Sequence, residues 1–162
     1  MSSPSEVALV VLDVDGVLTD GRLWFGAEGE QLKVFDVRDG HGIRRLIEAG
    51  IRVAVISGRR SGAVDARMRE LGVKDVAQGV ADKAQALAEL LRREGIESRH
   101  AACLVDDTPD LGLMAAVGLP AAVADAHPDV LTAAQHVTRA PGGRGAVREF
   151  CDWLLAARDA RR

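Results

Sequence analysis

The chain has 162 residues, of which 48% are hydrophobic and 28% charged, and its formal net charge is −3. This is the size and balance of one ordinary soluble domain, and no apolar stretch approaches the roughly 20 residues that cross a bilayer. Because lysine and arginine form no basic block, the composition gives little support to nucleic-acid binding. The first apolar run leads directly into acidic residues, which argues against a cleaved signal peptide and favours a cytoplasmic location.

Short apolar runs recur along the chain and predict strands at 6–12, 51–56, 100–105 and 119–124. Their lack of polar alternation suits strands that are buried on both faces of a parallel sheet. Segments with helical spacing lie between and after these runs, most clearly Val147, Phe150, Cys151, Leu154 and Leu155. This alternation predicts an α/β fold with a doubly wound, Rossmann-like parallel sheet, formed by residues 1–162 as a single domain.

The segment 21–37 interrupts the alternation of strands and helices. Two short apolar runs, LWF and LKVF, flank a turn-prone Gly-Ala-Glu-Gly sequence, which predicts a β-hairpin inserted after the first strand. This hairpin is too small to be a separate cap domain. It offers more apolar surface than two strands can bury, so we expect another subunit to cover Leu23, Trp24, Phe25, Val34 and Phe35.

Polar side chains follow the ends of three predicted strands. These are Asp13 with Asp15, then Ser57, and then Asp106 with Asp107. Ligands of open parallel sheets bind beyond the carboxyl ends of the strands, so we expect these groups to meet. Carboxylates that close repel one another unless a cation joins them, and Mg²⁺ takes few protein oxygens while keeping waters for a phosphate. The strand ends therefore predict a magnesium site.

Basic groups are placed near the same edge of the predicted sheet. Lys83 begins a leucine-rich helix, and Arg59 lies in the loop that follows Ser57. Hydroxyl, backbone N–H and guanidinium groups of such a loop can hold anionic oxygens. By contrast, the chain has no GxxxxGK[ST] phosphate loop, and Val17 and Leu18 stand where an EF-hand would need polar and glycine residues.

Four motifs occur in an order that resembles the haloacid dehalogenase superfamily of phosphatases: DVDGVLTDG, ISGR, Lys83 and VDDTPDLGLM. The resemblance extends to its small cap-less branch, typified by 3-deoxy-D-manno-octulosonate 8-phosphate (Kdo 8-phosphate) phosphatases, through FDVRDGHGIRRL, VADAHPDVL and VTRAPGGRGAVREFCDWLL. It covers nearly the whole chain and implies a Mg²⁺-dependent phosphoric monoester hydrolase.

The resemblance also implies roles for the acidic residues. Asp13 would be the nucleophile that forms an aspartyl-phosphate, and Asp15 would be the general acid and base. The Asp13 side chain, the Asp15 carbonyl and Asp106 would hold Mg²⁺. Asp107 and Asp110 would support the site.

Ser57 and Lys83 would hold the phosphoryl oxygens, according to the same resemblance. Arg59 and, from a glycine-rich stretch, Arg144 are candidates for binding the carboxylate of a sugar acid, since arginine matches a carboxylate in a bidentate way. Members of this branch form homotetramers through the hairpin and act in lipopolysaccharide biosynthesis.

The sequence is also consistent with two other functions. Within the superfamily, the substrate could instead be a nine-carbon nonulosonate 9-phosphate, which the sequence barely distinguishes from Kdo 8-phosphate. A phosphorylated receiver domain of two-component signalling also places carboxylates, a hydroxyl and a lysine at strand ends. In that domain, however, the acidic pair comes first along the chain, whereas here the Asp-Val-Asp motif comes first.

Overall fold

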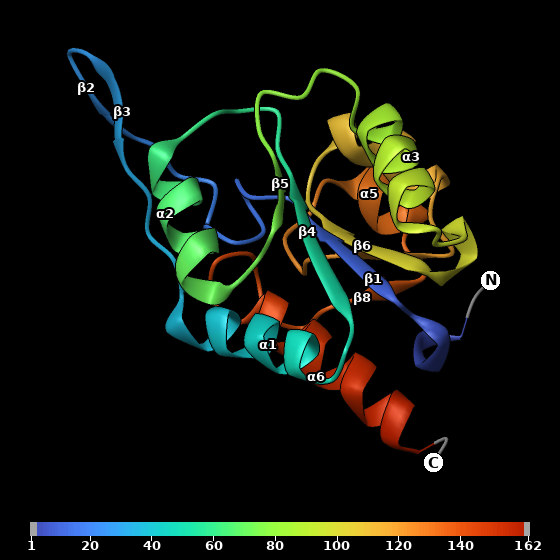
Figure 1. Ribbon diagram of the computed structural model, residues 1–162. Coiled ribbons are helices and arrows are strands. Elements are labelled where there is room, and N and C mark those ends of the chain that lie inside the picture. The colour runs from blue at the N-terminus through green and yellow to red at the C-terminus, as the bar shows by residue number, and fades with distance from the viewer. Residues whose placement is uncertain (1–2, 161–162) are drawn as a thin grey trace.

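Six parallel strands form the central sheet of the computed structural model, which describes residues 3–160 (Figure 1). Across the sheet the strands follow the order β5-β4-β1-β6-β7-β8, and all neighbours pair in parallel. This confirms the predicted doubly wound α/β sheet. The strands are β1 (Leu9–Leu12), β4 (Arg52–Ile56), β5 (Asp75–Ala77), β6 (Ala101–Val105), β7 (Leu119–Ala122) and β8 (His136–Val137).

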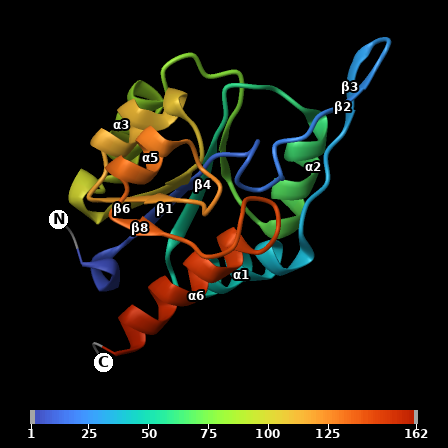
Figure 2. The same cartoon turned by 180° about the vertical axis from the view of Figure 1, so that it is seen from behind.

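Helices cover both faces of the sheet. On one face α1 and α6 lie side by side, with α2 continuing their layer, while α3, α4 and α5 cover the other face (Figures 1 and 2). Among residues 3–160, no helix is long and apolar enough to cross a membrane. The helices are α1 (Val37–Glu48), α2 (Gly62–Leu71), α3 (Lys83–Glu94), α4 (Leu111–Ala115), α5 (Pro128–Ala133) and α6 (Ala146–Asp159).

The predicted strands are longer than those in the structure. The run 6–12 yields strand only from Leu9, because a 3₁₀ turn occupies Pro4–Glu6, and the run 119–124 stops pairing after Ala122. The strands β5 and β8 at the two edges of the sheet were not predicted. They are two or three residues long and only partly buried, so no apolar run marks them in the sequence.

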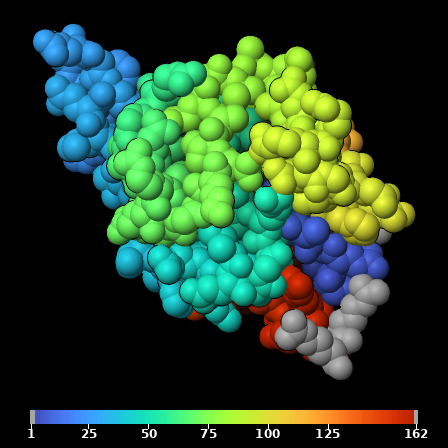
Figure 3. All heavy atoms as spheres, viewed as in Figure 1, coloured from blue at the N-terminus to red at the C-terminus, as the bar shows by residue number. Residues whose placement is uncertain are grey.

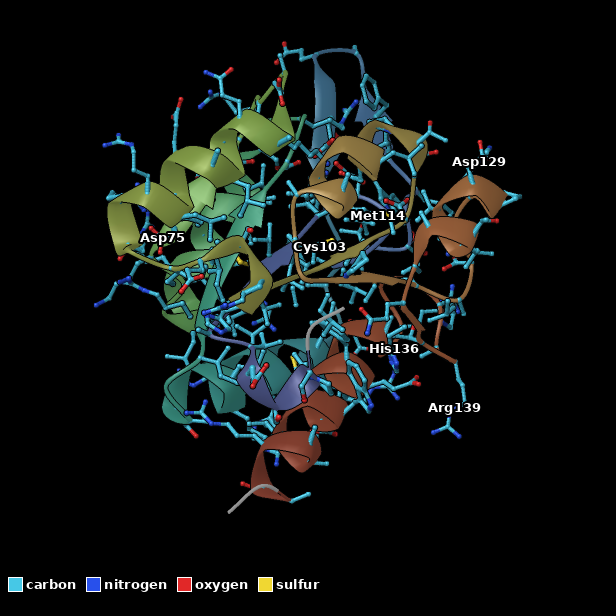
Figure 4. The ribbon with its side chains drawn as sticks, turned by 90° about the vertical axis from the view of Figure 1, so that its right-hand side faces the viewer. Asp75, Cys103, Met114, Asp129, His136 and Arg139 are labelled. Carbon is cyan, nitrogen blue, oxygen red and sulfur yellow. The ribbon has the colours of Figure 1, made fainter. Side chains whose placement is uncertain are left out.

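The strand order places the centre of the molecule at β1 and β6. Every residue of β1 and β6 is buried, and Cys103 lies in the middle of this layer (Figure 4). From β1 the chain first moves outward through β4 and β5 and then returns to the other side of β1 as β6. In open α/β sheets, the crevice where the strand order reverses is the preferred place for a ligand.

A two-stranded antiparallel hairpin extends from the body of the molecule (Figure 3). Its strands are β2 (Trp24–Gly26) and β3 (Gly29–Leu32), and they lie within the segment that the sequence predicted as a hairpin. Leu23, Trp24, Phe25, Leu32 and Val34 are exposed large apolar side chains in the single chain. Phe35 differs from the expectation, because it is partly buried against the hydrophobic core.

The helices α1 and α6 are joined by an unusual cap. The N-cap residue of α6 is a glycine in the left-handed region, so the helix has no cap of its own. Instead, Asp39 in the first turn of α1 accepts a 2.9 Å hydrogen bond from the backbone N–H of Arg148. The helices also approach closely at Gly42, where a Cβ atom would lie 3.1 Å from the Arg148 Cα atom. Packing and capping therefore depend on the same pair of turns.

We expect Asp39→Ala to lower the free energy of unfolding by about 1–2 kcal/mol, the usual loss when a capping acceptor is removed. Asp39→Asn keeps an oxygen acceptor for the Arg148 N–H and should lose less. Denaturant titration of the two variants measures this difference. Equal losses in both variants would show that the acceptor contributes nothing to docking of α6.

Candidate active site

Three carboxyl groups meet at the switch point of the sheet. Asp13 directly follows β1, Asp106 directly follows β6, and Asp110 closes the 3₁₀ turn Thr108–Asp110. One oxygen from each group lies within 4.8 Å of the others. Asp13 and Asp110 are almost completely buried. The strand order thus brings together residues that are far apart in the sequence.

The ionisation of these carboxyl groups reflects their crowding. Burial, reinforced by the neighbouring charge of Asp110, raises the pKa of Asp13 to about 6. Burial together with the charges of Asp13, Asp110 and Asp107 raises the pKa of Asp106 to about 8. Burial likewise raises the pKa of Asp110. A site that disfavours its own negative charge this strongly fits a divalent cation, and buried carboxylate oxygens are the donors that Mg²⁺ selects.

Lys83 supplies one fixed positive charge to the group. It is the first residue of α3, and its Nζ atom lies 2.9 Å from Oδ1 of Asp13 and 2.6 Å from Oδ1 of Asp110. Burial alone would lower the pKa of Lys83, but these two carboxylates outweigh it and raise the pKa. The ammonium group therefore stays charged. It has three donors, so one remains for a further oxygen.

The loop after β1 holds its shape through a tight turn at Gly16. Gly16 has φ +86°, a conformation that side-chain-bearing residues rarely adopt, and its N–H donates to the Thr19 hydroxyl over 3.3 Å. A Cβ atom at Gly16 would overlap the Asp106 carboxylate. Glycine is thus needed both for the turn and for the approach of Asp106 to this loop.

Ser57 follows β4 at the same edge of the sheet. The residue is buried, and its backbone is fixed on both sides, since its N–H donates to Ala77 and its carbonyl accepts from Val80. Among residues 3–160 the Ser57 hydroxyl makes no hydrogen bond. A rigidly placed hydroxyl without a partner is suited to hold a ligand oxygen.

Asp15 lies beside this group but pairs with other residues. Its Oδ1 atom accepts a 2.5 Å hydrogen bond from Lys33, and its Oδ2 atom lies 3.8 Å from Nε of Arg59. The carboxyl group of Asp15 is not part of the three-carboxylate group. A Cβ atom on its neighbour Gly16 would overlap the Asp106 carboxylate, so the backbone beside Asp15 passes close to Asp106, as a ligand role for the Asp15 carbonyl requires.

The pairing with Lys33 was not anticipated from the sequence. Glu30 lies in β3 and Lys33 directly follows this strand, and Glu30 binds both Lys33 and Arg59 over 3.0 Å. The available signal was a single lysine inside the apolar run LKVF. A charged residue between two apolar neighbours of an extended segment points to the opposite side from them.

Asp107 and Arg144 lie further from the carboxylates. Asp107 is exposed and caps the 3₁₀ turn by accepting from the Thr108 N–H over 2.7 Å. Arg144 is exposed too, and its guanidinium group lies 3.7 Å from Asp20. It lines a groove of about 530 Å³ together with the base of the hairpin. Within this chain, Arg144 therefore contacts the end of the loop after β1 and not the three-carboxylate group.

The glycine-rich stretch around Arg144 packs on the loop after β1. It folds back from β8 toward that loop (Figure 2), and the Gly143 N–H donates to the Val17 carbonyl over 2.8 Å. A Cβ atom at Gly142 would overlap the carbonyl oxygen of Gly16. The glycine-rich stretch therefore makes a close backbone contact that glycine alone permits.

Comparisons with known proteins agree with this geometry. Residues 74–149 match the haloacid dehalogenase-like hydrolase family. A 3-deoxy-D-manno-octulosonate 8-phosphate phosphatase of Yersinia pestis is 48% identical over 155 residues, which cover 96% of this chain and 83% of that relative.

Solved structures extend the comparison to three dimensions. The crystal structure of a 3-deoxy-D-manno-octulosonate 8-phosphate phosphatase from Yersinia pestis has a TM-score of 0.94 and 48% identity, covering 96% of this chain and 84% of that one. The enzyme from Moraxella catarrhalis, solved with a magnesium ion, a phosphate ion and a KDO molecule, has a TM-score of 0.93 and 38% identity, with coverages of 98% and 92%. The chain therefore belongs to the family of these phosphatases, within the haloacid dehalogenase-like hydrolases.

Proposed function

We propose that this phosphatase hydrolyses the phosphate monoester of a keto-sugar acid, Kdo 8-phosphate, through an aspartyl-phosphate on Asp13. The observation that carries the proposal is the buried Asp13 carboxylate, paired with Lys83 over 2.9 Å and joined by two further carboxylates at the switch point. The relatives that are named for this reaction match the chain over nearly its full length.

The first chemical step transfers the phosphoryl group to the protein. A carboxylate oxygen of Asp13 attacks phosphorus in line, and the bond between phosphorus and the sugar oxygen breaks. Asp15 gives its proton to the departing sugar oxygen, which leaves as an alcohol. This assignment suits the position of Asp15, two residues after the nucleophile and outside the group of crowded carboxylates.

The second step releases inorganic phosphate. Asp15, now ionised, takes a proton from a water molecule, whose oxygen attacks the phosphorus of the aspartyl-phosphate. The bond between phosphorus and the Asp13 oxygen breaks, and the carboxylate of Asp13 is restored. The free Oδ2 atom of Asp15, which accepts no hydrogen bond within residues 3–160, is available for both proton transfers.

Charge around the phosphoryl group is balanced by three partners. Asp13, Asp106 and the Asp15 carbonyl would hold Mg²⁺, which would supply positive charge to offset that of the nucleophile and the phosphate. Lys83 has a third donor for a phosphoryl oxygen, and the Ser57 hydroxyl offers another. Asp110 holds Lys83 in place over 2.6 Å, and Asp107 caps the adjoining turn.

A panel of phosphate esters with released phosphate measured tests the proposed function. The panel should hold Kdo 8-phosphate, a nine-carbon nonulosonate 9-phosphate and several ordinary sugar phosphates. We expect the highest kcat/KM for Kdo 8-phosphate. A higher kcat/KM for the nine-carbon ester would identify a nonulosonate 9-phosphate as the substrate. No hydrolysis of any ester would reject the proposed function. The predicted cytoplasmic location and role in lipopolysaccharide biosynthesis depend on this substrate.

Asp13→Asn should abolish turnover while the protein stays folded. An amide cannot form the acyl-phosphate, so we expect activity below about a hundredth of that of the unmodified protein. The substitution also removes one charge from a crowded site, so the free energy of unfolding should not fall. Activity assays beside thermal unfolding measure both effects. Substantial residual turnover would contradict the role of Asp13 as nucleophile.

Removal of the metal should stop hydrolysis reversibly. Without a divalent cation, the negative charge of Asp13, Asp106 and the phosphate is left unbalanced. We therefore expect excess chelator to abolish phosphate release and added Mg²⁺ to restore it. Full activity in the presence of chelator would overturn the assignment of the metal site.

Arg59→Ala should weaken turnover of the keto-sugar acid phosphate far more than turnover of a small artificial ester without a carboxylate. Losing one charge-assisted contact to the substrate carboxylate should lower kcat/KM roughly ten-fold to a hundred-fold. The same comparison applies to Arg144→Ala, whose side chain would act in the site of a neighbouring subunit. Equal losses on both esters would place these arginines in phosphate binding or folding.

The exposed hairpin favours a homotetramer. Trp24, Phe25, Leu32 and Val34 are each 59–65% exposed in the single chain, and an apolar patch of this kind usually marks an interface. We expect light scattering at micromolar concentration to give the mass of four chains. A monomer under these conditions would defeat the proposal.

A further inference from the structure

The hairpin reverses the usual distribution of side chains between surface and interior. Its aromatic residues Trp24 and Phe25 are 59% and 65% exposed, whereas the side chain of Lys33 is only 3% exposed. Lysine is among the residues most rarely buried, because its charge loses hydration. Burial of the Lys33 ammonium group is therefore stable only if nearby acidic groups replace the lost hydration.

The partners of Lys33 form a closed ring of alternating charges. Its Nζ atom lies 2.5 Å from Asp15 and 3.0 Å from Glu30. Glu30 in turn lies 3.0 Å from Nη2 of Arg59, and Nε of Arg59 lies 3.8 Å from Asp15. The four residues come from three segments: the loop after β1, the hairpin and the loop after β4. The ring therefore ties the hairpin to both sides of the active site.

Within the ring, Lys33 holds Asp15 by one oxygen only. The contact is to Oδ1, and the distance of 3.8 Å between Oδ2 and Arg59 is too long for a hydrogen bond. A carboxyl group that is anchored through one oxygen keeps the other in a fixed direction. This is the arrangement that a general acid needs, because proton transfer requires the donor oxygen within about 2.6–3.2 Å of the oxygen that receives the proton.

We propose that Lys33, itself held by Glu30, is a positioning residue that aims the free carboxyl oxygen of Asp15 at the leaving-group oxygen. The inference rests on the proposed function, since it assigns a partner to the acid of that mechanism. Its consequence is that the hairpin takes part in the chemical step and is more than a surface for contacts between subunits.

The leaving group distinguishes this role from a structural one. A good leaving group departs as an anion without a proton, whereas a poor one depends on the general acid. Aryl phosphates with different phenols vary this property while their shape and charge stay nearly constant, and they lack the carboxylate that Arg59 is expected to bind. The parameter kcat/KM covers the steps up to phosphoryl transfer, so release of phosphate from Asp13 does not mask the effect.

The experiment compares Lys33→Met, Lys33→Arg and Asp15→Asn on phenyl, 4-nitrophenyl and 2,4-dinitrophenyl phosphate. We expect Lys33→Met to lower kcat/KM for phenyl phosphate by about ten-fold or more, within the roughly 10²- to 10⁴-fold that a general acid contributes. The loss should shrink to about two-fold or less for the dinitrophenyl ester. Asp15→Asn should show the same trend more strongly, and Lys33→Arg should recover part of the loss.

The matched control is Lys74→Met, which removes the same charge from an exposed lysine. Lys74 directly precedes β5, so it lies where the strands begin, whereas the candidate site lies where they end. The Lys74→Met variant should match the unmodified protein on all three esters. Equal losses by Lys33→Met on every ester, or no loss, would overturn the inference and leave the proposed function intact. An Asp15→Asn variant without leaving-group dependence would instead reject Asp15 as the acid, and the inference with it.

Discussion

Negative charge packed between β1 and β6 is the constraint on which the rest of the site depends. Three carboxyl groups meet where water is largely excluded, and their pKa values rise as a result. Such a cluster persists only with cations close by. The start of α3 supplies one as Lys83, and the proposed Mg²⁺ would supply the other. The positive charge that stabilises the carboxylates is thus also available to a dianionic phosphate.

The sequence was sufficient to predict the groups that directly follow strands. Asp13, Ser57 and Asp106 end apolar runs, and a parallel sheet necessarily brings such ends to one edge. The same logic recovered the fold, because four of the six strands are apolar runs. It failed for β5 and β8, which lie at the edges of the sheet and are too short to show a pattern.

Contacts that depend on side-chain direction could not be predicted in this way. Lys33 appears in the sequence as one residue of an exposed hairpin, and only the folded chain shows that it turns inward to Asp15. Asp39 looks like an ordinary acidic residue in a first helical turn, yet it caps a different helix. Arg144 lies beside Asp20 within the chain, a contact that the sequence did not indicate, and its role in substrate recognition stays a prediction. Each of these contacts joins segments that no local pattern connects.

The backbone contact between Gly143 and Val17 has a consequence for how activity arises during synthesis of the chain. Asp13 and its loop leave the ribosome early, but the segment that braces the loop is made more than a hundred residues later and is held by the cap from Asp39 to α6. An incomplete chain would carry Asp13 on an unbraced loop. Phosphatase activity should therefore appear only after α6 has docked, so the activity of a newly made chain would indicate that its folding is complete.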